Sequence, residues 1–395
     1  MKQPALKSSL VLLTIISVVC DTMILPFYPQ FFSAQFGLQS SNHIGAYIAV
    51  CCITVMCAFP VWAKIAQHVH ELYLWVITQI MAGLLGVACF YSENVWSFWL
   101  LSQLMLVFKA SYLLIYPFVL SIEEKQQHLG VVALFSVLLH FGGIGGALLG
   151  GLIIQSIEPR FLYLVMAAGD CLQVMLCLYL IYLLKVSYKP RELSASSVKR
   201  QRFPGYIIRL GVISMGVYFS MFLATPYFTL LWQQVSNFSN ALLAGAVFAI
   251  PAWVALIILI TTKNKAATNK HSKTIAYALV LSSIGLFIQL SSHWQWLVFG
   301  RVVFAIGLFL LTVRLQVMLF AMSEPRFYSS DFAKLHFMQN IGVICASFLA
   351  GDLVSRFELN TPLLTGSVGF AITLCLFYLL FLRNKHTSTD PIHSY

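Results

Sequence analysis

The sequence predicts an all-α membrane protein with twelve transmembrane helices in two six-helix pseudo-repeats. Three observations support this fold class: the composition, the length of the apolar runs and the distribution of charge. Of the 395 residues, 59% are hydrophobic and 9% are charged, and the mean hydropathy is +0.85. Soluble domains have about 25% charged residues. The chain is therefore expected to lie in a lipid bilayer.

Each crossing of a bilayer needs ~20 mostly apolar residues. The first apolar run follows Lys2 and Lys7, but it contains Asp21 and has no convincing small-residue cleavage site. Because it is also too long for a signal peptide, it is interpreted as an uncleaved first helix. The twelve predicted helices span 8–32, 43–63, 72–92, 97–120, 128–154, 161–185, 206–231, 240–262, 274–291, 295–321, 333–354 and 361–383.

The positive charges predict the topology. With the N-terminus inside, nineteen of the 24 lysines and arginines fall in cytoplasmic segments, two fall outside and three lie within helices. This bias is typical of a multi-pass protein of the inner (cytoplasmic) membrane with both termini in the cytoplasm. The net charge of +11 is thus a topology signal, and no nucleic-acid partner is expected.

The longest polar interval divides the helices six and six. The predicted domains are an N-terminal bundle, 1–185, a cytoplasmic linker, 186–205, and a C-terminal bundle with a cytoplasmic tail, 206–395. Shifting the sequence by 200 residues superimposes landmarks of the two halves, which supports a duplicated six-helix unit. The landmarks include Pro26 with Pro226, Gly45 with Gly245, Gly142 with Gly342 and Gly151 with Gly351.

The fifth predicted helix contains six glycines between Phe141 and Gly151. Glycine destabilises the interior of a soluble helix by roughly 0.5–1 kcal/mol relative to alanine. In a bilayer the backbone stays helical because no water can satisfy freed polar groups. Small residues four apart then allow another helix to approach closely. Two interpretations stay open: a surface on which helices move during transport, or an ordinary packing face.

At this motif the chain resembles the major facilitator superfamily of transporters, and the resemblance covers all twelve helices. The pattern Gly142-x-x-x-Gly146-Ala147-x-x-Gly150-Gly151 is similar to the antiporter motif in the fifth helix of drug and metabolite exporters, with Ala147 in place of a proline. The loop after the second helix fits the family less well, because Gln67 stands where an aspartate is usual. The resemblance implies the twelve-helix fold and an exporter driven by protons.

Two ionisable residues are candidates for proton coupling, because charged groups within a bilayer usually face a cavity or a partner. Asp21 is either a titrating proton carrier or a fixed ion pair with Lys109. His140 is either a proton relay or a neutral histidine that hydrogen-bonds between helices. Asp170 lies on the sixth helix, which tends to be peripheral in the resembled fold, so we expect it to make a structural contact.

The resemblance also implies substrate-binding residues, because the fourth and eleventh helices line the central cavity in transporters of this fold. The alternatives are helix packing for the tyrosines and a wet cytoplasmic mouth for the group on the eleventh helix. The candidates are Lys109, Tyr112 and Tyr116 on the fourth helix, Arg314 on the tenth, and His336, Gln339 and Asn340 on the eleventh.

The predicted function is proton-coupled export of a small organic molecule. No GxxxxGK[ST] motif is present, so direct ATP hydrolysis is not expected. The nine cysteines form no CxxC or His/Cys cluster, so neither a metal nor another cofactor is expected, and the protein is not predicted to be an enzyme. The partners are protons, a small-molecule substrate and lipid, and the protein is expected to be monomeric.

The cations Lys109, Arg301 and Arg314 suggest an anionic substrate, such as a carboxylate siderophore, and a drug-like compound is the other possibility. Two alternative functions remain: import of an organic anion, and a membrane sensor or scaffold without transport activity. A membrane-embedded transferase would need an acidic metal-binding cluster within the membrane, and the sequence shows none.

Overall fold

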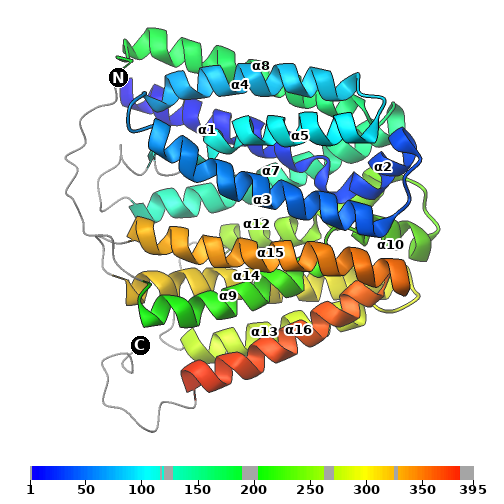
Figure 1. Ribbon diagram of the computed structural model, residues 1–395. Helices are drawn as coiled ribbons and strands as arrows, with labels where there is room; N and C mark the ends of the chain where they lie inside the picture. The colour runs from blue at the N-terminus through cyan, green and yellow to red at the C-terminus, as the bar shows by residue number, and fades with distance from the viewer. Residues whose placement is uncertain are drawn as a thin grey trace. The chain divides into compact units, whose positions relative to one another are not determined.

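The structure is a computed structural model that describes residues 2–115, 118–119, 128–188, 203–261, 271–323 and 328–382 (Figure 1). In these residues every regular element is helical. The first half contains α1 (Lys2–Thr22), η1 (Leu25–Phe27), α2 (Tyr28–Phe36), α3 (Ser41–Ile65), α4 (Glu71–Phe90), α5 (Val95–Lys109), η2 (Ala110–Leu114), α7 (His128–Ser156) and α8 (Phe161–Leu184). The second half contains α9 (Gly205–Leu223), α10 (Phe228–Ser236), α11 (Ala241–Phe248), α12 (Ile250–Thr261), α13 (His271–Ile288), α14 (Trp294–Met322), α15 (Tyr328–Arg356), α16 (Thr361–Phe377) and the π-helical η5 (Tyr378–Leu382).

The helices confirm the predicted fold class. Within the described residues, ten spans are long and apolar enough to cross a membrane, and the bent pair α11 and α12 supplies an eleventh. Residues Lys273–Ile288 of α13 form a shorter apolar helix at the position of the remaining predicted segment. Each of the twelve predicted runs is therefore occupied by helix.

The chain folds into two compact units. The first consists of Met1–Gln39, Val50–Val198 and Asn240–Ala246, and the second of Ser40–Ala49, Lys199–Ser239 and Val247–Tyr395. Most of the predicted linker, 186–205, lies outside the described residues, so the predicted domain limits stay a prediction.

Prolines explain where spanning segments are interrupted. Pro26 lies in the 3₁₀ turn η1 between α1 and α2, and Pro226 lies between α9 and α10. Pro251 lies at the start of α12, which is bent by 46° from α11. Proline has no N–H and its ring clashes with the carbonyl four residues earlier, so each one breaks the helical ladder. Pro26 and Pro226 are 200 residues apart, as the pseudo-repeat requires.

The glycines of α7 form a seat for α1 inside the first unit. A Cβ atom added to Gly146 would lie 2.8 Å from the Val19 carbonyl oxygen and 3.1 Å from the Met23 nitrogen. At Gly150 it would lie 2.9 Å from the Met23 carbonyl carbon. Two turns of α7 therefore contact α1 with no room for a side chain, as small residues permit in membranes.

Two further glycine crossings repeat the same geometry in the two units. Within the first unit, a Cβ atom on Gly151 of α7 would lie 2.6 Å from the Ala241 oxygen of α11. Within the second unit, a Cβ atom on Gly351 of α15 would lie 2.6 Å from the Ser41 oxygen of α3. The two glycines, Gly151 and Gly351, are 200 residues apart, and so are their contact residues, Ser41 and Ala241. The 200-residue pseudo-repeat found in the sequence therefore also relates these two helix contacts.

The α7 seat gives a test with a matched control. We expect Gly146→Leu to destabilise the protein by at least ~1–3 kcal/mol, the usual effect of overpacking, and to abolish transport without removing the protein from the membrane. Gly143→Leu should have little effect, because a Cβ atom there would meet nothing within 4 Å. Thermal unfolding of both purified variants in detergent measures the difference. Equal midpoints would contradict close packing at Gly146.

Candidate functional site: a buried ion triad

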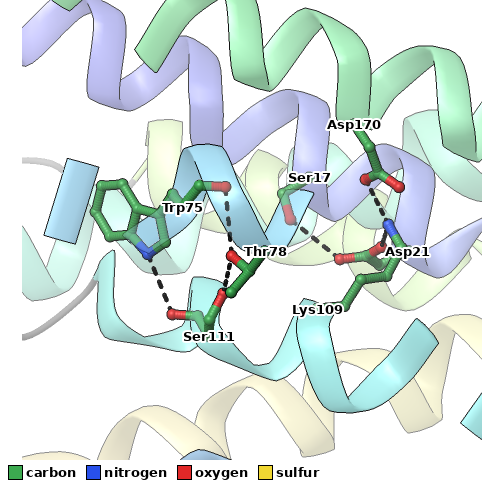
Figure 2. Close-up of polar contacts among 7 residues, drawn as sticks. All are labelled: Ser17, Asp21, Trp75, Thr78, Lys109, Ser111 and Asp170. Carbon is green, nitrogen blue, oxygen red and sulfur yellow. Dashed lines mark hydrogen bonds and ion pairs between the residues drawn. The ribbon is translucent and has the colours of Figure 1, made fainter. Parts of the chain in front are cut away.

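Lys109 connects three helices of the first unit through its ammonium group (Figure 2). Its Nζ atom lies 2.9 Å from Asp21 Oδ1 on α1 and 2.7 Å from Asp170 Oδ1 on α8. Hydrogen-bond geometry accompanies both ion pairs. We call Asp21, Lys109 and Asp170 the ion triad.

The two carboxylates of the ion triad differ in accessibility. The Asp170 side chain is fully buried, whereas that of Asp21 is 38% exposed, and Lys109 is 6% exposed between them. Ser17 donates a hydrogen bond of 3.0 Å to the second oxygen of Asp21. The second oxygen of Asp170 has no hydrogen-bond partner among the described residues. Solvent can therefore reach the triad at Asp21, which we call its accessible end, and cannot reach it at Asp170, which we call its closed end.

The local sequence explains how these helices come close together. Gly169 precedes Asp170, and a Cβ atom there would collide with the Cys20 sulfur of α1. Gly83 of α4 lies opposite Asp170, with 3.6 Å between the Asp170 Cβ atom and the position of an added Cβ atom. Small residues therefore allow α1 and α4 to approach α8 at the level of the buried carboxylate.

The backbone after Lys109 changes from α-helix to the 3₁₀ helix η2, and side chains of α4 fix this change (Figure 2). Trp75 donates its indole N–H to the Ser111 carbonyl at 3.1 Å. The hydroxyl oxygens of Thr78 and Ser111 are 2.7 Å apart. Short 3₁₀ segments within a helix often mark a hinge or a functional site. Here the segment begins next to the triad cation.

The other predicted residues of the fourth helix are not arranged as an open substrate site. Tyr112 is buried, and its hydroxyl donates a hydrogen bond of 3.3 Å to Thr14. Its ring packs against Trp75, which agrees with the packing alternative. Tyr116 lies outside the described residues. Lys109 is held by two carboxylates and so is not presented to a substrate in this structure.

His140 lies on α7, six residues before Gly146 of the glycine seat, and is half-buried. Its ring makes no hydrogen bond with the described residues. The structure therefore supplies neither the relay contact nor the interhelical bond considered for it, and its role stays a prediction.

The predicted residues of the second unit lie on α14 and α15. Arg314 is half-buried on α14. On α15, His336 is exposed, Gln339 is buried, and the Asn340 side chain donates a hydrogen bond of 3.0 Å to the His336 carbonyl. Substrate binding by these four residues stays a prediction.

Arg301 was expected to contribute to an anion-facing surface, and the structure gives it a different environment. The side chain is 4% exposed, with its guanidinium carbon 3.8 Å from the centre of the Phe228 ring. It also donates a hydrogen bond of 3.0 Å to the carbonyl of Phe248, where α11 ends before Pro251. Arg301 thus satisfies a carbonyl at a helix break and stacks on an aromatic face.

The sequence predicted a structural contact for Asp170 but not its partner. The structure supplies that contact as an ion pair with Lys109. The available signal was the cost of an acid within an apolar run, ~2.5–3.5 kcal/mol, which requires a partner. The preceding Gly169 was a second signal, because it permits a close helix crossing.

The apolar spanning helices define the class of a multi-pass membrane protein, and three helices of the first unit carry the ion triad. The family model of the Major Facilitator Superfamily matches residues 10–265 and 268–394. The chain therefore belongs to this superfamily and is a transporter of small organic molecules. This confirms the resemblance at the level of the family, and the exporter group stays a prediction.

Solved structures with the same fold include several transporters. A point mutant of nucleoside transporter NupG gives a TM-score of 0.75 at 12% identity, over 95% of this chain and 100% of that one. A bacterial homolog of the human lysosomal transporter Spinster gives 0.70 at 12%, over 96% of each chain. The human organic anion transporter MFSD10 gives 0.68 at 14%, over 94% of this chain and 98% of that one. At these identities the likeness shows the fold alone. A comparison with curated protein sequences finds no match.

The ion triad predicts a strong stability effect. Lys109→Gln should lower the free energy of unfolding by ~3–5 kcal/mol, because it leaves a buried carboxylate without a cation. Adding Asp170→Asn should recover part of the loss. Arg356→Gln is the control, since its pair with Asp352 is exposed and such pairs contribute ~0–1 kcal/mol. Thermal unfolding in detergent measures all three, and a stable Lys109→Gln protein would refute the assignment.

Proposed function

We propose that the protein is a proton-coupled secondary transporter that exports a small organic molecule, with the ion triad as its coupling site. The observation that supports this most directly is the sharing of Lys109 between a fully buried carboxylate and an accessible one. Asp21 can exchange a proton at the accessible end, while Asp170 keeps the lysine charge balanced. A fixed structural pair would need only one acid.

Protonation of Asp21 would change the force between α1 and α5. Two unit charges ~4 Å apart interact by about 4 kcal/mol at an effective dielectric constant near 20. Because Asp21 is 38% exposed, solvent screens its attraction to Lys109 below this value. Neutralising Asp21 removes the attraction, whereas the contact of Lys109 with Asp170 remains. A proton on Asp21 thus acts on α1 and leaves the pairing of α5 with α8 in place.

The glycine seat supplies a route from this local change to a larger movement. The α1 residues that contact the α7 glycines, Val19 and Met23, flank Asp21 in the sequence. A shift of α1 at Asp21 therefore acts directly on α7, because the two backbones are in contact and no free space separates them. In major-facilitator transporters helices move relative to a central site to expose it alternately to each side. We assign the α7 glycines to this movement, with both termini in the cytoplasm and the protein acting as a monomer.

The charges of the site bear on the substrate class. Of the three cations that suggested an anion, Lys109 is held by two carboxylates and Arg301 by aromatic rings and a carbonyl. The expectation of a carboxylate siderophore now depends on Arg314. The accessible charge of the triad is the carboxylate of Asp21, which favours a cationic or amine-containing compound that competes with the proton. An anionic substrate is the alternative outcome of the test below.

Asp21→Asn tests the coupling role. Asparagine keeps the size and polarity of the side chain but removes the titratable proton, so pH-gradient-driven transport should be lost while counterflow of bound substrate is kept. Proteoliposomes loaded with a lipophilic cation or a citrate-based chelator measure both activities. Asp352→Asn is the matched control, since Asp352 pairs with Arg356 on an exposed surface.

Three outcomes would contradict the proposal. Unchanged pH coupling in Asp21→Asn would remove Asp21 as the proton carrier. Transport of the chelator but not the cation would establish an anionic substrate. No substrate-dependent proton flux in the unmodified protein would favour the sensor or scaffold alternative.

A further inference from the structure

A second group of buried polar atoms lies on α4 and α8, close in sequence to the Asp170 end of the ion triad. Gln79 of α4 and Gln173 of α8 are 2% and 1% exposed. The Gln79 Oε1 atom and both polar side-chain atoms of Gln173 have no hydrogen-bond partner among the described residues, and neither has Asp170 Oδ2. Four polar atoms on α4 and α8 are therefore without a hydrogen-bond partner in the part of the chain that the structure describes.

The register of the two helices places these atoms at neighbouring levels. Added Cβ atoms at Gly83 and Gly86 would lie 3.6 Å and 3.4 Å from the Cβ atoms of Asp170 and Ala167. Gly83 faces Asp170 and Gly86 faces Ala167, so residue numbers rise in α4 as they fall in α8, and the two helices are antiparallel. One turn before Gly83 in α4 is Gln79, and one turn after Asp170 in α8 is Gln173. The same register therefore places Gln79 opposite Gln173. This level is one turn from Asp170, toward the ends of α4 and α8 that the charge bias predicts to be cytoplasmic.

Unpaired polar atoms at this position need a physical explanation. A buried polar group without a partner costs ~1–3 kcal/mol, and leucine would pack there without that cost. Buried water that makes two to four hydrogen bonds to such groups is a regular part of protein structure. Gln79, Gln173 and the free oxygen of Asp170 provide acceptors and a donor for water at one place.

We propose that Gln79, Gln173 and Asp170 Oδ2 form a buried water site that delivers protons to Asp170. This gives the ion triad a second proton route at its closed end, separate from the exposed side of Asp21. The inference rests on the proposed proton coupling and adds Asp170 as the second exchanging group. In the step, a hydronium ion gives its proton to Asp170 Oδ2, which leaves a neutral carboxylic acid and a water molecule.

The charges around Asp170 allow this step. The groups that face it are Asp21 and the Cys20 thiol on α1 and Lys109 on α5, whereas α4 presents Gly83 and no charged group among the described residues. With both acids ionised, the triad has one negative charge in excess. One proton removes that excess, and Lys109 then pairs with whichever carboxylate stays ionised. Two acids on one lysine can therefore hold a single proton at either end.

A pair of hydroxyl groups lies on the neighbouring face of α4. Thr78 is adjacent to Gln79 in the sequence, and its hydroxyl is hydrogen-bonded to Ser111, two residues after Lys109. Hydroxyl groups both donate and accept hydrogen bonds, but the Thr78 hydroxyl is bonded to Leu74, Trp75 and Ser111 and not to Gln79. The proposed water site therefore rests on Gln79, Gln173 and Asp170 alone.

The experiment compares Gln173→Leu and Gln79→Leu with Gln289→Leu. Gln289 is the matched control: it is 1% exposed, directly after α13 in the second unit, with its Oε1 atom also unpartnered. We expect Gln173→Leu and Gln79→Leu to slow pH-gradient-driven transport by roughly tenfold or more, equivalent to a barrier about 1.4 kcal/mol higher. Counterflow, which needs no net proton movement, should change little, and the control should behave as the unmodified protein.

Infrared spectroscopy of the Asp170 carboxylic acid gives a readout that does not depend on transport, and the Asp170→Asn variant assigns its band. Hydrogen–deuterium exchange of the Asp170 carboxyl proton should slow in Gln173→Leu and stay fast in Asp21→Asn. Normal pH coupling and fast exchange in both glutamine variants would overturn the water site but leave coupling through Asp21 intact. Unchanged coupling in Asp21→Asn would instead refute the proposed function. If Gln173→Leu does not fold, the Gln79→Leu variant decides the question alone.

Discussion

A bilayer interior has no water to solvate a charge, so each buried ion must find its partners within the protein. Lys109 meets this requirement with two carboxylates, at 2.9 and 2.7 Å, and in doing so joins α1, α5 and α8. The arrangement of the first unit follows from this contact. Gly83 and Gly169 let the helices approach the buried carboxylate, and the η2 turn positions the lysine. One lysine with two ion pairs therefore connects helices that are far apart in the sequence.

Arg301 shows the other way to place a cation in this environment. It has no ion-pair partner among the described residues, and the Phe228 ring and the Phe248 carbonyl stabilise its charge. Aromatic faces and a carbonyl do not titrate, so this environment is the same at every pH. The cation of the ion triad instead has carboxylates as partners, and a carboxylate is a group that can bind a proton. This chemical difference distinguishes the environment of Arg301 from that of Lys109.

The sequence predicted the twelve helical segments because bilayer thickness sets their length, and that constraint acts within each segment. It also predicted a close-packed face from Gly142, Gly146 and Gly150, because spacing along one helix is readable from sequence. The partner helix was not predictable, since the spacing says nothing about which neighbour approaches. The pairing of Lys109 with Asp170 was missed for the same reason: 61 residues separate them, and resemblance alone had placed the sixth helix at the periphery.

Helix α1 contacts both the glycine seat and the ion triad, on two of its sides. Val19 and Met23 face α7, and Ser17 and Asp21 face the lysine. On the α7 side the contact is backbone against backbone, and close-packed contacts transmit displacement because they have no free volume to absorb it. On the triad side the contact is an ion pair between Asp21 and Lys109. Under the proposed proton coupling, the loss of this ion pair would move α1, and the close contact would transmit that displacement to α7. The replacement of the usual motif proline by Ala147 is consistent with this, because the seat needs close approach and does not need a kink.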